Sequence, residues 1–197
     1  MKQAQLKELL IQSLQHERGG IQVYETAINC AVNDELKGEW QKYLEQTRNH
    51  ERILLEVFQQ LSLDPEEDSP GRQVVASLGA ALVEAMRLAS KGGDLTAAEL
   101  VACECVVLAE TKDHADWELL SKCAEKLTGK QQSVLQAACE EVEEQEDEHL
   151  YHSKGWCREL WLESLGLKAL LPPPEERKHV TSAIGAARAE QASQKGR

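Results

Sequence analysis

Apolar residues recur at intervals of three and four along most of the chain, with polar residues between them. This spacing is typical of helices that bury one face, because 3.6 residues complete each helical turn. Proline is absent from long stretches, and aromatic residues make up only 4% of the chain, which favours helices over a strand-rich fold. The pattern predicts five helices, at residues 3–32, 34–61, 69–90, 94–128 and 130–165.

Capping residues mark where these helices begin. Asp34 is the expected N-cap of the second helix, and Ser69, followed by a proline, is that of the third. The fourth helix has two candidate caps, Asp94 and Thr96, of which the second would form a capping box with Glu99. The third helix is shorter than the others, so we expect it to be a crossover between two pairs of long helices.

The length of the chain and its 42% hydrophobic content suit one domain with one substantial core. We therefore expect an all-α domain over residues 1–166, built as a four-helix bundle with an additional crossover helix between the second and third bundle helices. Residues 167–197 become polar and alanine-rich beyond LGLKALLPPP and contain too little apolar surface for a core of their own. We expect this C-terminal tail to be mobile or docked on a partner.

Composition limits the classes of function. The formal net charge of -12 repels phosphate backbones and attracts cations, which argues against nucleic-acid binding. The N-terminal segment has charged and amide residues among its apolar ones, so it is typical of neither a secretory signal nor a membrane span, and a cytoplasmic location is expected. The six cysteines form no CxxC pair, and we expect them to be reduced thiols.

The chain contains an internal repeat of two helices. A shift of 93 residues lays HERGGIQVYETAINCA, from residue 16, over AETKDHADWELLSKCA, from residue 109. A shift of 99 residues lays LEQTRNH, from residue 44, over EEQEDEH, from residue 143. The difference between the two shifts fits a longer connection between the helices of the second pair, so we interpret the bundle as two related helical hairpins.

Polar side chains interrupt the apolar stripe of each long helix. They are Glu17 in the first helix, Thr47 and His50 in the second, Glu110 in the fourth, and Glu146 and His149 in the fifth. The glutamates of the first and fourth helices and both histidines lie about 16 to 20 residues from the turns that they flank. At about 1.5 Å per residue, the groups of each antiparallel pair are therefore level. Several buried carboxylates close together would be prohibitive without a cation, so the pattern predicts one polar layer that binds metal.

One glutamate from each of two helices and a Glu-x-x-His pair from each of the other two form the ligand pattern of ferritin-like di-iron carboxylate bundles. Over residues 3–165 the chain resembles that superfamily. The crossover, the LEQTRNHERILLEVFQQL segment and the AEKLTG ending of the fourth helix are most similar to the YciE/YciF-type branch of stress-associated ferritin-like proteins. The resemblance implies a ferritin-like fold that often forms a homodimer, and a site for one or two iron ions or for manganese or zinc.

Carried over to this chain, the resemblance implies five metal ligands: Glu17, His50, Glu110, Glu146 and His149. The chain departs from the pattern at Thr47, where the second helix should supply a bridging glutamate. A water, His114 or His152 could fill this vacancy, because both histidines lie close to the inward face of their helices. The site could therefore hold two metals, one metal or none.

Two functions stay open. The resemblance implies that, as an enzyme, the protein would be a di-iron oxidoreductase of the ferroxidase or peroxidase type, which oxidises iron or reduces peroxide in a stress response with dioxygen or peroxide as substrate. Alternatively, it is a non-catalytic, stress-associated bundle with a degenerate metal site, which acts as a structural or interaction protein through its acidic surface and its tail. Metal content separates the two, because only the first requires a stoichiometric metal.

Overall fold

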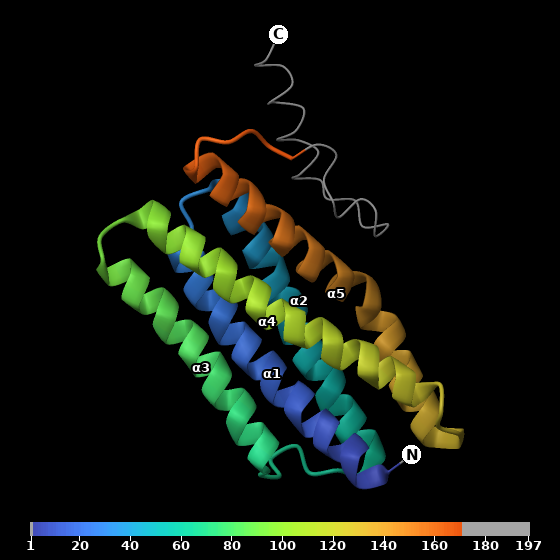
Figure 1. Ribbon diagram of the computed structural model, residues 1–197. Coiled ribbons are helices and arrows are strands. Elements are labelled where there is room, and N and C mark those ends of the chain that lie inside the picture. Colours follow the sequence, from blue (N-terminus) through green and yellow to red (C-terminus); the bar gives the residue numbers. More distant parts are fainter. Residues whose placement is uncertain (1, 171–197) are drawn as a thin grey trace.

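The computed structural model describes residues 2–170, and all the regular structure in that range is α-helical, as the sequence predicts. Most of the expected C-terminal tail, residues 171–197, lies outside the described residues. Within residues 2–170, no helix combines the length and the apolar character needed to cross a membrane. The helices are α1 (Gln3–Cys30), α2 (Asp34–Leu61), α3 (Pro70–Lys91), α4 (Leu95–Ala124) and α5 (Gly129–Ser164) (Figure 1).

The helix boundaries differ from the sequence predictions at several places. Asn33, one residue before the expected cap, is the N-cap of α2, and its side-chain oxygen accepts hydrogen bonds from two backbone N–H groups of the first turn. Asp94 rather than Thr96 caps α4. α4 ends at Ala124, four residues before its predicted end, because i→i−3 hydrogen bonds tighten the chain there into a turn. Ser69 is the N-cap of α3, as predicted.

Four helices form a bundle in which each runs antiparallel to its two neighbours: α1 packs against α2 and α4, and α5 packs against the same two helices (Figure 1). The shorter α3 lies outside these four, against α1 and α4. It carries the chain back along the bundle, so that α4 begins at the end where α2 begins (Figure 1). The fold therefore consists of two helical hairpins, α1 with α2 and α4 with α5, and α3 connects them.

Gly19 and Gly20 lie within α1 without interrupting it, and both allow close packing. A Cβ built on Gly79 of α3 would lie only 3.5 Å from the Cα of Gly19. A Cβ on Gly20 would lie 3.3 Å from Cγ2 of Thr47 on α2. α1 therefore approaches two of its neighbours closely at one level, near the middle of the bundle.

The apolar core consists of two clusters, one toward each end of the bundle, and both contain buried residues from α1, α2, α4 and α5. The cluster near the connection of α1 to α2 includes Trp40 and Trp156. The other cluster includes Phe58 and Trp117. Between them lies a level at which the buried side chains are polar. Two apolar clusters thus enclose a polar layer, in agreement with the interrupted stripes in the sequence.

Glu99 of α4 is buried, and its Oε1 accepts hydrogen bonds from the backbone N–H groups of Val32 (2.7 Å) and Asn33 (2.6 Å) in the connection of α1 to α2. The substitution Glu99→Ala leaves both N–H groups without this acceptor, which should cost about 2–4 kcal/mol of unfolding free energy. Urea unfolding measures this loss. Glu104→Ala, which removes an exposed carboxylate from the same helix, should change stability by no more than about 0.5 kcal/mol. Equal losses for the two variants would contradict the role of Glu99 in this connection.

Candidate metal centre

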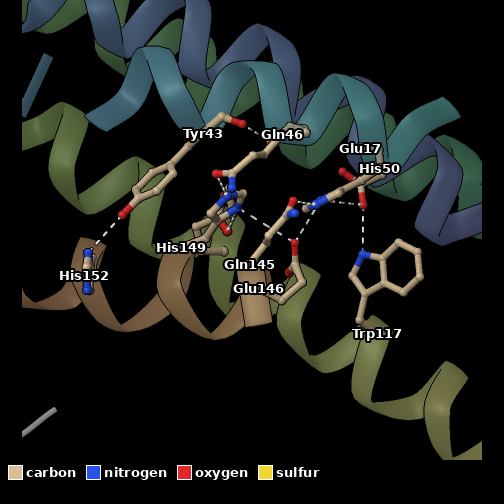
Figure 2. Close-up of polar contacts among 12 residues, drawn as sticks. Glu17, Tyr43, Gln46, His50, Trp117, Gln145, Glu146, His149 and His152 are labelled. Atoms are coloured by element: carbon tan, nitrogen blue, oxygen red, sulfur yellow. Dashed lines mark hydrogen bonds and ion pairs between the residues drawn. The ribbon is translucent and has the colours of Figure 1, made fainter. Parts of the chain in front are cut away.

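The polar layer lies midway along the bundle and contains side chains from all four bundle helices (Figure 2). Every residue that the sequence analysis named as a principal ligand lies there, and each exposes at most 3% of its surface. These residues are Glu17 (α1), His50 (α2), Glu110 (α4), and Glu146 and His149 (α5). Glutamate is almost never buried to this degree unless it is paired, so the layer needs a compensating partner.

The two imidazoles face the carboxylates across the layer. Nδ1 of His50 lies 3.1 Å from Oε1 of Glu146 and 3.8 Å from Oε1 of Glu17. Nδ1 of His149 lies 3.5 Å from Oε2 of Glu110 and 3.8 Å from Oε1 of Glu146. An ion bonded at about 2.1 Å to two ligand atoms holds them no more than about 4.2 Å apart. All four distances are below this limit, and Glu146 faces both histidines.

A glutamine from the opposite helix orients each imidazole ring. Nε2 of His50 lies 2.9 Å from Oε1 of Gln145 on α5, and Nε2 of His149 lies 3.0 Å from Oε1 of Gln46 on α2. A neutral imidazole that donates through Nε2 is an acceptor at Nδ1. Both Nδ1 lone pairs therefore point into the layer, as metal ligation requires.

Several buried atoms of the layer have no hydrogen-bond partner among the described residues. They are Glu17 Oε2, His50 Nδ1, Glu110 Oε2, Asp113 Oδ1, Glu146 Oε1 and Oε2, and His149 Nδ1. Buried polar atoms are almost always hydrogen-bonded in native proteins, because an unpaired one costs roughly 1–3 kcal/mol. Carboxylate oxygens and bare imidazole nitrogens that face one another form the donor set of a metal site. The residues present therefore fit a bound metal.

Aromatic side chains form part of the wall of the layer. Nε1 of Trp117 donates a hydrogen bond of 2.8 Å to Oε1 of Glu17 (Figure 2). The ring of Trp117 lies edge-on to that of His50, with 6.1 Å between the centroids. Tyr43 packs against His149, with 4.4 Å between the ring centroids. These contacts restrict rotation of Glu17 and of both histidines, so the fold orients them without help from a metal.

Asp113 is a member of the layer that the sequence analysis missed. It is buried, and one of its oxygens lies within 4.8 Å of an oxygen of Glu17 and of an oxygen of Glu146. The signal was present in the sequence, because Asp113 follows Glu110 by three residues and so shares its helical face. The two glutamines that orient the histidines were also visible, as identical residues at matching positions of the repeat.

His114 and His152 point away from the layer. Nε2 of His114 lies 2.7 Å from Oδ1 of Asp147, and this side chain is 14% exposed. Nδ1 of His152 lies 3.0 Å from the hydroxyl group of Tyr43, beyond His149 (Figure 2). Neither histidine belongs to the groups of potential ligand atoms found among residues 2–170. Metal binding by either one stays a prediction that this geometry does not favour.

Burial and crowding raise the pKa values of carboxyl groups in the layer. Burial, the larger cause, and the nearby charge of Glu146 raise the pKa of Glu17 to about 8. Burial and the neighbouring carboxylates raise the pKa values of Asp113 and Glu146 well above their usual range. Burial also lowers the pKa of His149. Glu110 differs: burial acts to raise its pKa, but the contact with His149 lowers it overall. Without a cation the layer therefore holds protons on the carboxyl groups of raised pKa, and a bound cation would displace them.

A pocket of about 580 Å³ lies between α4 and α5, beside the layer. Glu146 and Trp117 form its inner wall. The charged side chains around its outer part are Glu118, Glu143, Asp147 and Lys122. Because carboxylates outnumber the single lysine, this approach favours cations and small neutral molecules over anions.

Comparison with protein-family models, with curated proteins and with solved structures finds no match to this chain. The resemblance to ferritin-like proteins therefore stays a prediction. A functional assignment depends on the site itself, which means the residues that converge in the layer and the contacts that orient them.

The raised pKa of Glu17 makes the stability of the metal-free protein depend on pH. A carboxyl group with a pKa near 4.5 in the unfolded chain and about 8 in the fold stabilises the fold fully below the lower value. This contribution is lost as the pH rises toward the higher value, by roughly 1.4 kcal/mol for each pH unit. Metal-free protein should therefore unfold at a lower urea concentration at pH 8 than at pH 5.5.

Glu17→Gln is the control for this pH dependence, because it keeps the size of the side chain and removes the titrating group. The variant should show a smaller difference in unfolding midpoint between the two pH values. A wild-type midpoint that was the same at pH 5.5 and pH 8 would contradict a protonated layer.

Proposed function

We propose that this protein is a ferritin-like, iron-binding protein that holds two metal ions in the polar layer and oxidises ferrous iron or reduces peroxide there. One observation carries the proposal: unpartnered carboxylate oxygens and imidazole nitrogens from four helices converge at one buried level. Mixed oxygen and nitrogen ligands suit iron or manganese, and zinc is a further candidate. The Glu-x-x-His pair of Glu146 and His149 adds support, because both of its members face the layer.

Iron, when bound, would supply the redox chemistry with dioxygen or peroxide. The residues of the protein would bind the metal, orient its ligands and shield it from water. Gln46 and Gln145 hold the imidazoles with Nδ1 directed inward. The two apolar clusters keep water from both ends of the layer, while the pocket at Glu146 is large enough to admit dioxygen, peroxide or a hydrated ion.

A specific observation favours the non-catalytic alternative. Each apolar cluster joins all four bundle helices, so together they supply a core without any contribution from the layer. A metal-free bundle with protonated carboxyl groups could then act as a structural or interaction protein, in which the polar groups only fix the register of the helices. Stoichiometric iron would support the first function, and a metal-free but fully stable protein would support the second.

Glu146 faces both histidines, and both of its oxygens lack a partner, so Glu146→Ala should remove the bound metal. Elemental analysis of protein purified without chelator measures the loss. Glu144→Ala is the matched control, because it removes an exposed carboxylate two residues away on the same helix and should keep the wild-type stoichiometry. Unchanged metal content in the Glu146 variant would exclude this residue as a ligand.

The redox reaction is tested on the same proteins. Ferrous iron and then dioxygen or peroxide are added to the metal-free form, and ferric absorption is followed with time. The wild type and Glu144→Ala should form ferric iron faster than buffer alone, whereas Glu146→Ala should not. A wild type that binds iron but oxidises it no faster than buffer would count against an oxidoreductase and in favour of the structural alternative.

Gln46→Ala and Gln145→Ala should each lower metal affinity by roughly 10- to 100-fold, because the facing imidazole loses the acceptor that orients it. Competition with a chromogenic chelator measures the affinity. Gln136→Ala, which removes an exposed glutamine from α5, should bind metal as the wild type does. Wild-type affinity in both layer variants would mean that other contacts hold the rings.

A further inference from the structure

The two related hairpins contribute unequally to the layer. The 93-residue shift that aligns α1 with α4 pairs Gly20 with Asp113, and the 99-residue shift that aligns α2 with α5 pairs Thr47 with Glu146. One hairpin thus supplies two uncharged residues at the positions where the other supplies two carboxylates. The remaining members match across the repeat, Glu17 with Glu110 and His50 with His149.

Gly20 and Thr47 themselves supply no carboxylate to the layer. They lie in close contact, since a Cβ on Gly20 would be 3.3 Å from Cγ2 of Thr47. The hydroxyl group of Thr47 donates a hydrogen bond of 2.9 Å to the backbone oxygen of Tyr43 within its own helix. The carboxylate that α2 lacks is present instead on α4, as Asp113.

The potential ligand atoms fall into two groups, each with its atoms within 4.8 Å of one another. One group contains His50, Glu146 and His149, and the other contains Glu17, Asp113 and Glu146. Glu146 belongs to both groups, and neither of its oxygens has a partner, as a carboxylate shared by two ions requires. Glu110, at 3.5 Å from Nδ1 of His149, adds to the first group, and Glu17 of the second group lies 3.8 Å from Nδ1 of His50, so the two groups adjoin.

We propose that these groups are two unequal metal positions: an imidazole position that selects iron strongly, and an all-oxygen position, completed by Asp113, that also takes a harder divalent ion such as manganese. This inference rests on the proposed metal-binding function and specifies its metals. Affinity for divalent ions generally rises from manganese to iron, but imidazole suits iron, whereas carboxylate suits manganese. The advantage of iron is therefore smallest at the all-oxygen position, so manganese in excess enters that position while iron keeps the imidazole position.

The all-oxygen position is more than a cluster of acidic residues. Glu17, Asp113 and Glu146 are almost completely buried, and each has at least one oxygen without a partner. Carboxylates at this spacing repel one another strongly where water is excluded. The hydrogen bond from Trp117 satisfies only one oxygen of Glu17 and leaves the other unpartnered. A cation would satisfy all three residues at once.

Metal competition tests the inference. Metal-free protein, kept without oxygen, is given an excess of ferrous ions and a larger excess of manganous ions, freed of unbound metal and measured by elemental analysis. The expected result is about one iron and one manganese per chain, because the two positions have different ligand sets. Two iron ions and no manganese would overturn the inference, because the two positions would then have the same preference.

Substitutions identify which residues hold the manganese. Asp113→Asn should remove the manganese and retain the iron, and Glu17→Gln, which changes the same position from another helix, should have the same effect. Asp116→Asn is the matched control, because this buried aspartate of α4 pairs with Lys112 instead of facing the layer, and both metals should remain. Retention of both metals by Asp113→Asn, or loss of both, would overturn the all-oxygen position.

Thermal unfolding separates a binding defect from misfolding. Asp113→Asn relieves crowding in the metal-free layer, so the variant should unfold at or above the temperature of the wild type. Added manganese should raise the melting temperature of the wild type but not of the variant. If the wild type bound no metal at all, the proposed function itself would fail. If it bound two ions regardless of Asp113, only the further inference would fail.

Discussion

The burial of four carboxyl groups and two imidazoles at one level of an apolar bundle is the constraint on which the rest of the structure depends. A charge moved from water into such an interior costs several kcal/mol unless it is neutralised. The layer can exist only because protons or cations neutralise it and because apolar clusters on both sides stabilise the helices that carry it. The orienting contacts of the glutamines and of Trp117 add rigidity, so the ligand atoms cannot turn outward to escape one another.

The level of this layer could be predicted from the sequence, because residue counts along a helix convert directly into distance. Glu17 and His50 lie at similar distances along the chain from the connection of α1 to α2, and Glu110 and His149 do so from the connection of α4 to α5. Antiparallel packing then brings all four to one height. The apolar clusters follow from the same periodicity, because the stripes above and below these residues consist mainly of apolar side chains, which gain from burial.

Helix ends and side-chain directions were less predictable, because they depend on distant contacts. Asn33 and Asp34 can both cap a helix, and the backbone before α2 is held by Glu99, which comes from a helix far along the chain. Asp113 and His114 are adjacent on α4, but only Asp113 faces the layer. Which of the two turns inward depends on the rotation of α4 about its own axis, and packing against α1 and α5 sets that rotation.

The carboxylates and imidazoles of the layer can be counted against the ligand set of a two-metal site. One glutamate from each of two helices and a Glu-x-x-His pair from each of two others give four carboxylates and two imidazoles. This layer contains the same number of each, although α2 supplies one carboxylate fewer and α4 one more. Two divalent ions carry four positive charges, which four carboxylates neutralise, so a filled layer would be uncharged in its apolar surroundings. Asp113 thus brings the number of carboxylates in the layer to the four that two divalent ions need, although α2 contributes the uncharged Thr47.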